Sequence, residues 1–518
     1  MAKKWWTLTA VSTGTFMLLL DVTIVSVALP DIQRDLGASF GELQWVADVY
    51  ALALASLLLT SGALADRFGR RRVFLTGLVV FTAASLLCGL AHDPALLIVS
   101  RGIQGIGGAM LFATSLALLA GTFHGRERGV AFGVWGAVTG IATALGPILG
   151  GLITTGIGWR GIFVVNVPVG VFAVVLTVLT VGETRASHAR RIDWLGMTAF
   201  TLGLAALVYG LTEAGEESWG AGIVLGAFAA AAVLLTAFVL IERSADEPMF
   251  DLSLLRVPTF LGGSVAAFAM NGSLFAMLIY LVIYLQNSLG YSAMETGVRL
   301  LVMSGTTMVV ATAAGRLSSR VPVRWLIGPG LLLVGVGLTV MTGLSADSSW
   351  THLVPGLLIA GIGSGLVNPP LASTAVGVVP IQRSGMASGA NNTFRQVGIA
   401  VGIAVYGSLF SSHLRSSMAD SLAGSPLAGR AEELAGAIRS GATGEATAGL
   451  PVGDRSLLEH AAHTAMADAM NTLLVTSGAV ALVGGVLAAV LIRSRDFLDS
   501  APASGTDGAP RVPVDAVS

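Results

Sequence analysis

Long apolar runs separated by short polar segments dominate the pattern of the chain. A helix needs about 20 mainly apolar residues to cross about 30 Å of hydrocarbon. Runs of that length predict six spans, then two more, then a last six. The predicted spans are 9–29, 43–64, 73–91, 98–121, 129–152, 162–181, 194–211, 221–241, 260–286, 296–317, 325–343, 352–378, 392–412 and 472–492. The pattern therefore predicts an all-α, polytopic membrane protein with 14 transmembrane helices.

The basic residues test this count, because cytoplasmic loops are enriched in Lys and Arg. With the N-terminus inside, most of the 29 basic residues fall in the loops expected on the cytoplasmic side. The first apolar run is far too long for a signal peptide, so it is predicted to stay as a span. We expect a multi-pass protein of the inner or plasma membrane with both termini cytoplasmic.

Composition narrows the function classes. Hydrophobic residues make up 54% of the chain and charged residues only 11%, against roughly 25% charged in soluble domains. The net charge of −1 leaves no basic surplus for nucleic acid. Cys88 is the single cysteine, and no Cys/His cluster has metal-ligand spacing, so no metal or cofactor is expected. No GxxxxGK[ST] loop and no convincing hydrolase or redox constellation occurs, so an enzyme or ATP-driven pump is not predicted.

An internal repeat divides the chain. A shift of 253 residues superposes GALADRFGRRR (62–72) on GRLSSRVPVRW (315–325), and a shift of 256 superposes the glycines of GIGGAM on those of GIGSGL. Parallel repeats place a substrate site near the midplane between the two halves. The predicted domains are an N-terminal six-helix bundle (1–185), two extra helices (186–250) and a C-terminal six-helix bundle (251–496).

Two segments are expected outside the membrane. Residues 413–471 are rich in Ala, Gly and Ser and are predicted to form a long extracellular loop. Within that loop, 456–470 has helical periodicity and is expected on the membrane face. The segment 497–518 has the composition of a disordered cytoplasmic tail.

Several motifs together resemble the major facilitator superfamily, specifically its 14-span drug/proton antiporters, which export drugs and antibiotics. They are LDVTIVSVALP (20–30), GALADRFGRRR (62–72), RGIQGIGGAM (101–110), GPILGG (146–151), WRGIFVVNVPVG (159–170), YLQNSLGYSAMETGVRLL (284–301) and ASGANNTFRQVGIAVG (387–402). The matches run in order from about residue 20 to 410. The resemblance implies two six-helix bundles plus two central helices, proton-driven export of small lipophilic or cationic substrates, and a monomer in the lipid bilayer.

Charges inside spans are costly and are functional candidates by default. The segmentation leaves Asp21, Asp48 and Arg101, with Gln104 close to the face of Arg101. Near the midplane, exclusion of water favours the protonated form of Asp21, whereas a nearby cation favours its charged form. Because these opposed effects let the acid both take up and release a proton, Asp21 is the predicted main proton site. Arg101 would tune it, and Asp48 would assist. The alternatives are a permanent Asp21–Arg101 pair, an Arg101 that reaches the membrane surface, and a solvated Asp48 at the outer mouth.

The resemblance also implies two structural devices. The loop would be a latch that stabilises the outward-facing state; its predicted residues are Gly62, Asp66, Arg67, Gly69, Arg70 and Arg71. Positive-inside topology alone would also explain the arginines. The motif of the fifth span would prevent proton leakage between the halves; its residues are Gly146, Pro147, Gly150 and Gly151. Ordinary close helix packing also explains such spacing.

A drug cavity has further candidates. Polar and aromatic side chains that would line it are Trp45, Tyr50, Asn166, Asn271, Tyr280, Asn391 and Asn392. Helix packing or an interfacial belt is the alternative for each one. Two other functions remain open: proton-coupled movement of a metabolite or anion by the same fold, or a non-transporting lipid-handling or sensor protein.

Overall fold

The computed structural model describes residues 3–123, 125–183, 193–245, 248, 250–318, 321–379, 384–439 and 451–497, and within a few helices of these ranges some side chains are not described. The described residues form helices and connecting turns, with no strand among them. The first half contains α1 (Lys3–Leu36), α2 (Phe40–Phe68), α3 (Arg70–Gly89), α4 (Pro94–Thr122), α5 (Gly125–Ile157), α6 (Gly161–Val164) and α7 (Asn166–Thr180). Then come α8 (Trp194–Glu216) and α9 (Gly222–Ser244). The second half contains α10 (Pro258–Met270), η2 (Asn271–Phe275), α11 (Ala276–Ile283), η3 (Tyr284–Ser288), α12 (Ala293–Leu317), α13 (Arg324–Val340), α14 (Val354–Val376), α15 (Ser384–Ser421), α16 (Ala431–Arg439) and α18 (Val452–Leu491).

Every predicted span falls on one helix or on a run of consecutive helices. Eleven helices of the described residues are long and apolar enough to cross a membrane, and α13 and the apolar part of α5 are shorter. Local chemistry sets several boundaries. Ser39 and Glu42 form a capping box at the start of α2, and Asp93 caps α4 just before Pro94. The all-α membrane architecture is confirmed, and the helices of the described residues are consistent with the 14 predicted spans.

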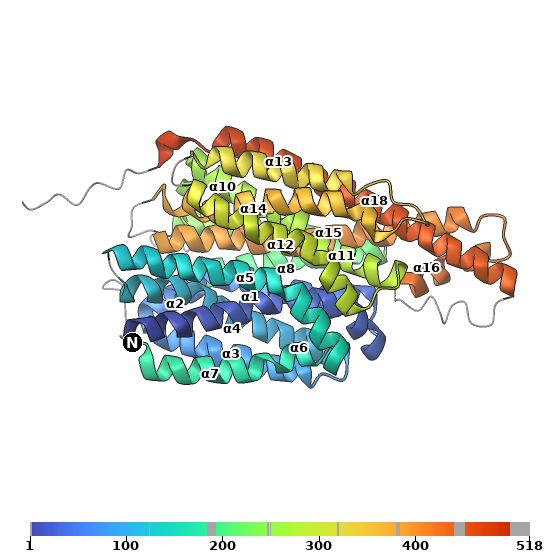
Figure 1. Cartoon of the computed structure of the whole chain (residues 1–518). Helices are drawn as coiled ribbons and strands as arrows, with labels where there is room; N and C mark the ends of the chain where they lie inside the picture. The colour runs from blue at the N-terminus through green and yellow to red at the C-terminus, as the bar shows by residue number, and fades with distance from the viewer. Residues whose placement is uncertain are drawn as a thin grey trace, which may run out of the picture.

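The helices lie roughly side by side (Figure 1). We call the two ends of the bundle the Lys3 end and the Leu36 end, after the first and last residues of α1. The Lys3 end carries the N-terminus. At the opposite, Leu36 end, α16 and the ends of α15 and α18 project beyond the other helices. The first half meets the second along two seams, α5 against α12 and α2 against α15.

The packing confirms the internal repeat. Gly105 of α4 packs against the backbone of Tyr50, and its counterpart Gly361 packs against Met303, which lies 253 residues after Tyr50. Gly107 likewise packs against Gly77, and Gly363 against Gly330, again related by 253 residues. An added Cβ on any of these glycines would meet backbone atoms of the neighbouring helix, so both halves use the same close helix contacts.

The two extra helices attach on one side. Side chains of α8 pack between α2 and α15, where Val208 is buried against Ala51 and Ala400. The second helix, α9, packs on α8, and most of its apolar side chains are partly or fully exposed, as expected for a lipid-facing helix. The extra pair therefore covers the α2–α15 seam.

The connection predicted as the loop 413–471 is largely helical where it is described. The span helix α15 continues to Ser421, and α18 begins at Val452 and runs for 40 residues through the last span. The expectation that 456–470 lies on the membrane face is therefore wrong. Alanine-rich sequence favours continued helix, and Leu434, Leu458 and Met466 join one buried cluster between α15, α16 and α18.

Candidate functional site

Asp21 lies near the middle of α1 and accepts hydrogen bonds from three side chains. Its Oδ2 accepts from Nη1 of Arg101 at 2.5 Å, and its Oδ1 accepts from Nε2 of Gln104 at 2.9 Å and Nδ2 of Asn166 at 3.0 Å. The side chains of Asp21 and Gln104 are fully buried. We call Asp21, Arg101, Gln104 and Asn166 the Asp21 network. All four donors and acceptors belong to the first half of the protein.

Arg101 is held from every side. Because α4 already begins at Pro94, this residue lies two turns inside the helix, and it is 2% exposed. Its Nε donates to the carbonyl of Val46 at 3.1 Å, and its guanidinium lies over the ring of Tyr50, 4.1 Å from the centroid. The alternative of an arginine that reaches the membrane surface is therefore wrong. The Asp21–Arg101 pair is present, as both the functional and the purely structural hypothesis require.

Asn166 has a different place from the one expected. Besides Asp21, its Nδ2 donates to Oγ of Ser85, and Ser85 donates to the carbonyl of Phe163. This residue thus joins α1, α3 and α7 inside the first half. Its amide orients the Asp21 carboxylate instead of lining a cavity between the halves. Ser85 had no sequence signal beyond being a small polar residue in an apolar span.

Asp48 contrasts sharply with Asp21. It is also fully buried, on α2, but neither carboxylate oxygen has a hydrogen-bond partner among the described residues. The alternative of a solvated acid at the outer mouth is wrong for this conformation. A buried carboxylate without a partner is costly, and the neutral acid avoids most of that cost.

Gln44 lies one helical turn before Asp48 and reaches into the second half. Its Nε2 donates to the hydroxyl of Tyr280 on α11 at 3.0 Å and approaches the carbonyl of Ile403 on α15 at 3.5 Å. The Tyr280 hydroxyl donates to that same carbonyl at 2.5 Å. The sequence did offer a signal for Gln44, an amide four residues before a buried acid, but it was not singled out.

The loop after α2 contacts its own half at the Lys3 end. Gly69 has φ of 110°, and a Cβ there would overlap the carboxylate of Glu183, which confirms a tight turn and a close approach. Arg70 and Arg71 donate to the carbonyls of Ala117 and Val178. Arg67 lies over the ring of Phe68.

For two of the predicted latch residues, Gly62 and Asp66, the described residues show no contact that supports a latch. A Cβ on Gly62 would meet no described atom within 4 Å, so the predicted close approach at Gly62 is not observed in this conformation. The side chain of Asp66 lies outside the described residues. The latch stays a prediction.

The motif of α5 lies where three helices meet. A Cβ on Gly146 would overlap Thr23 of α1, and one on Gly150 would lie 2.9 Å from the carbonyl oxygen of Ile24. Gly151 faces the second half: its Cβ would be 2.5 Å from the carbonyl oxygen of Ala293, and Pro147 contacts Gly297 of α12 in turn. The helix continues through Pro147. These residues therefore form a closely packed seam between the halves.

The other cavity candidates divide by position. Tyr50 and Asn166 belong to the surroundings of Asp21, whereas Trp45 packs against Tyr209 of α8. Asn271 opens the π-helical turn η2 and donates to the carbonyl of Ala267. Asn391 is buried and Asn392 half-buried on α15.

The structure adds Arg395, one turn after Asn391. It is half-buried, and its Nε has no hydrogen-bond partner among the described residues. The predicted span begins at residue 392, three residues before Arg395. The helix begins eight residues earlier, at Ser384.

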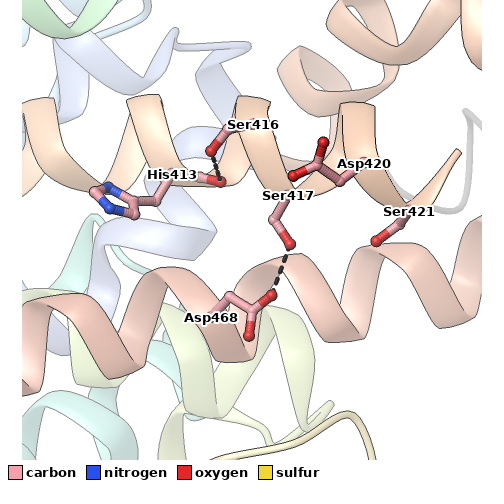
Figure 2. A pocket seen from close by; sticks show the side chains of 6 residues that line it. All are labelled: His413, Ser416, Ser417, Asp420, Ser421 and Asp468. Carbon is pink, nitrogen blue, oxygen red and sulfur yellow. Dashed lines mark hydrogen bonds between the residues drawn. The ribbon is translucent and has the colours of Figure 1, made fainter. Parts of the chain in front are cut away.

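A polar hollow of about 460 Å³ lies apart from these residues, on the projecting part of α15 and α18 (Figure 2). Ser417 donates to Asp468 across it, and Asp420 and Asp468 are exposed. Within the described part of the chain, no group of three or more His, Cys, Asp or Glu side chains is placed to hold a metal ion.

Several drug and antibiotic resistance proteins are similar in sequence to most of the chain. It is 37% identical over 413 residues to the multidrug resistance protein Stp of Mycobacterium tuberculosis, covering 80% of this chain and 77% of that protein. It is 35% identical over 490 residues to the tetracenomycin C resistance and export protein of Streptomyces glaucescens, covering 94% and 91%. The puromycin resistance protein pur8 of Streptomyces alboniger is 36% identical over 81% of this chain and 84% of its own length.

Solved structures agree on the fold. A bacterial homologue of the human lysosomal transporter Spinster, in an inward-facing and occupied conformation, has a TM-score of 0.69 at 16% identity and covers 97% of this chain and 100% of its own. The family model described as Major Facilitator Superfamily matches residues 11–403. The chain is therefore a multi-pass membrane protein that belongs to the major facilitator superfamily, with relatives that are multidrug and antibiotic resistance and export proteins.

Proposed function

We propose that this protein exports a lipophilic, cationic or amphipathic compound in exchange for protons, with the Lys3 end and both termini on the cytoplasmic side. Its relatives support the export of drugs and antibiotics. The expected excess of Lys and Arg in cytoplasmic loops supports the orientation. The domain limits at 185, 250 and 496 remain part of this proposal, as does a monomer.

The contrast between the two buried acids carries the proton assignment. Asp21 is paired with Arg101 and accepts hydrogen bonds from two further amides. Arg101 and the two amides thus supply a cation and N–H donors that compensate a negative charge on this carboxyl group inside the protein. Asp48 has no partner among the described residues, and burial favours its neutral form. In this conformation, then, Asp48 holds the exchangeable proton, and Asp21 with Arg101 serves as the fixed charge pair of the first half.

This assignment changes the order expected from sequence, in which Asp21 led and Asp48 assisted. Asp21 would join the exchange only in a conformation that draws Arg101 away from it. Two contacts at the Leu36 end hold this conformation closed: Nε2 of Gln286 donates to the carbonyl of Val27, and the backbone N–H of Met294 donates to Thr155. The substrate would therefore enter from the Lys3 end and leave after these contacts break.

The test has two stages. A susceptibility panel with ethidium, puromycin and tetracenomycin C in a strain lacking other exporters identifies a substrate. The purified protein in liposomes then exports that compound with and without an imposed pH gradient. We expect the gradient to accelerate export by wild type and to have no effect on Asp48→Asn. A wild type indifferent to the gradient would refute proton coupling, and an Asp48→Asn variant that responds fully would refute the role of Asp48.

A further inference from the structure

The contact made by Gln44 occupies the boundary between Asp48 and the Leu36 end. Gln44 and Asp48 are four residues apart, so they lie on the same face of α2, with Gln44 nearer the Leu36 end. Gln44 is 6% exposed and Asp48 is fully buried. Any path for water from the Leu36 end along this face reaches Gln44 before it reaches Asp48.

The second half is shaped to receive this one side chain. Gly407 of α15 has no side chain, and a Cβ there would overlap the Gln44 amide. The hydroxyl of Tyr280 and the carbonyl of Ile403 accept from that amide, and the rings of Tyr406, Phe40 and Phe410 surround Tyr280. We call the packing of Gln44 against Tyr280, Ile403 and Gly407 the Gln44 contact.

The Gln44 contact links the halves and lies beside the acid. The Asp48 carboxyl is near enough to the Tyr280 hydroxyl for an electrostatic interaction. Among the ionisable side chains on helices packed against α2 are Asp21, Arg101, Tyr209, Glu213, Arg395 and Tyr406. Since α2 and α15 belong to different halves, the contact must break whenever the Leu36 end opens.

We propose that Gln44 is a positioning residue for proton exchange: the Gln44 contact keeps Asp48 from water at the Leu36 end until the halves separate there. This inference rests on the proposed proton-coupled function and deepens it. The amide takes no proton itself. It controls when the carboxyl of Asp48 meets the outer solution, so that the proton enters only in the open state.

A leak measurement without substrate tests the inference. Liposomes holding the protein and the pH dye pyranine receive a proton gradient while valinomycin and K⁺ fix the membrane potential. Gln44→Ala is expected to raise the passive proton flux about fivefold, the factor that corresponds to a hydrogen bond of about 1 kcal/mol. Gly407→Ala, which displaces the amide, is expected to do the same. Gln44→Met keeps the volume but loses the hydrogen bonds, and its flux should fall between Gln44→Ala and wild type.

The matched comparison is Gln286→Ala, which also loosens the Leu36 end but leaves the Gln44 contact in place. Gln286 is also a buried glutamine that donates across the halves, to Val27 at 2.8 Å, but it contacts α1 and not the region of Asp48. A merely structural role would give all these variants the same behaviour. We further expect Gln44→Ala to move the pH of half-maximal export to lower values, because water at Asp48 stabilises its carboxylate. Gln286→Ala loosens the same end of the bundle but keeps the Gln44 contact, so its shift should be smaller.

The outcomes separate the two proposals. A wild type that shows no proton coupling defeats the proposed function. A coupled wild type in which Gln44→Ala and Gly407→Ala leak no more than Gln286→Ala, with an unchanged pH profile, overturns the role of Gln44 alone.

Discussion

Gly151→Ala offers a measurable perturbation of the seam between the halves. The added Cβ would lie 2.5 Å from the carbonyl oxygen of Ala293 and 2.7 Å from Cα of Met294, both backbone atoms that no rotamer change can move. To restore an ordinary contact of 3.4 Å, α5 and α12 must separate by almost 1 Å at the Leu36 end. Overpacking of this kind costs about 1–3 kcal/mol. Because 1.4 kcal/mol is about tenfold in an equilibrium, the closed state should lose roughly 5- to 150-fold against the open one.

Spin-label distances measure that shift. His92 and Asp347 are exposed at the Leu36 end of the first and second halves, and the one native cysteine, Cys88, is buried. Labels on His92→Cys and Asp347→Cys should report a new, longer distance population in Gly151→Ala. Gly156→Ala is the control, since its Cβ on the same helix would meet no described atom within 4 Å. An unchanged distance distribution in Gly151→Ala would refute the reasoning, as would an equal shift in the control.

Three further outcomes follow from the packing and the buried charges. Arg101→Met leaves Asp21 as an uncompensated buried charge and should lower the free energy of unfolding, measured by heating in detergent, by about 3–5 kcal/mol. The double variant with Asp21→Asn should recover much of that loss. Equal losses in the single and double variants would show that the pair is not coupled. Gly107→Ala and Gly363→Ala overpack equivalent helix contacts and should each lower the unfolding temperature, while Gly305→Ala, beside open space, should not. Tyr280→Phe should weaken the Gln44 contact and give a proton leak smaller than that of Gln44→Ala; a leak equal to wild type would place the contact on Ile403 alone.

Much of the fold follows from sequence because each span must be long, apolar and helical. The apolar runs between charged residues predict where the helices lie, although Pro30 and Pro147 lie inside helices. The repeat predicts how the helices pair, and the glycines of GIGGAM and GIGSGL do pack at equivalent places. The charge cost inside a span also singles out Asp21, Asp48 and Arg101. The prediction was wrong about where some helices end, because no strong helix-stop signal marks those positions. The Ala-rich sequence after residue 412 predicts a loop with helical periodicity only at 456–470, whereas α15 continues to Ser421 and α18 begins at Val452.

The partners of the buried acids were harder to foresee. Asn166 and Asp21 are far apart in sequence, and only the packing of α7 beside α1 brings them to 3.0 Å. Likewise, the sequence around Gln44 does not predict its contact with Gly407, because that contact depends on how α2 and α15 pack across the seam. Two acids of the same type in similar apolar spans thus acquire opposite surroundings. Our proposal that Asp48 carries the exchanged proton rests on that difference.

Infrared difference spectroscopy tests this central claim most directly. Addition of the exported compound should remove a carboxylic-acid carbonyl band as the protein releases its proton. The account predicts that this band is present in wild type and in Asp21→Asn and is missing in Asp48→Asn. A band that persists in Asp48→Asn and disappears in Asp21→Asn would contradict it.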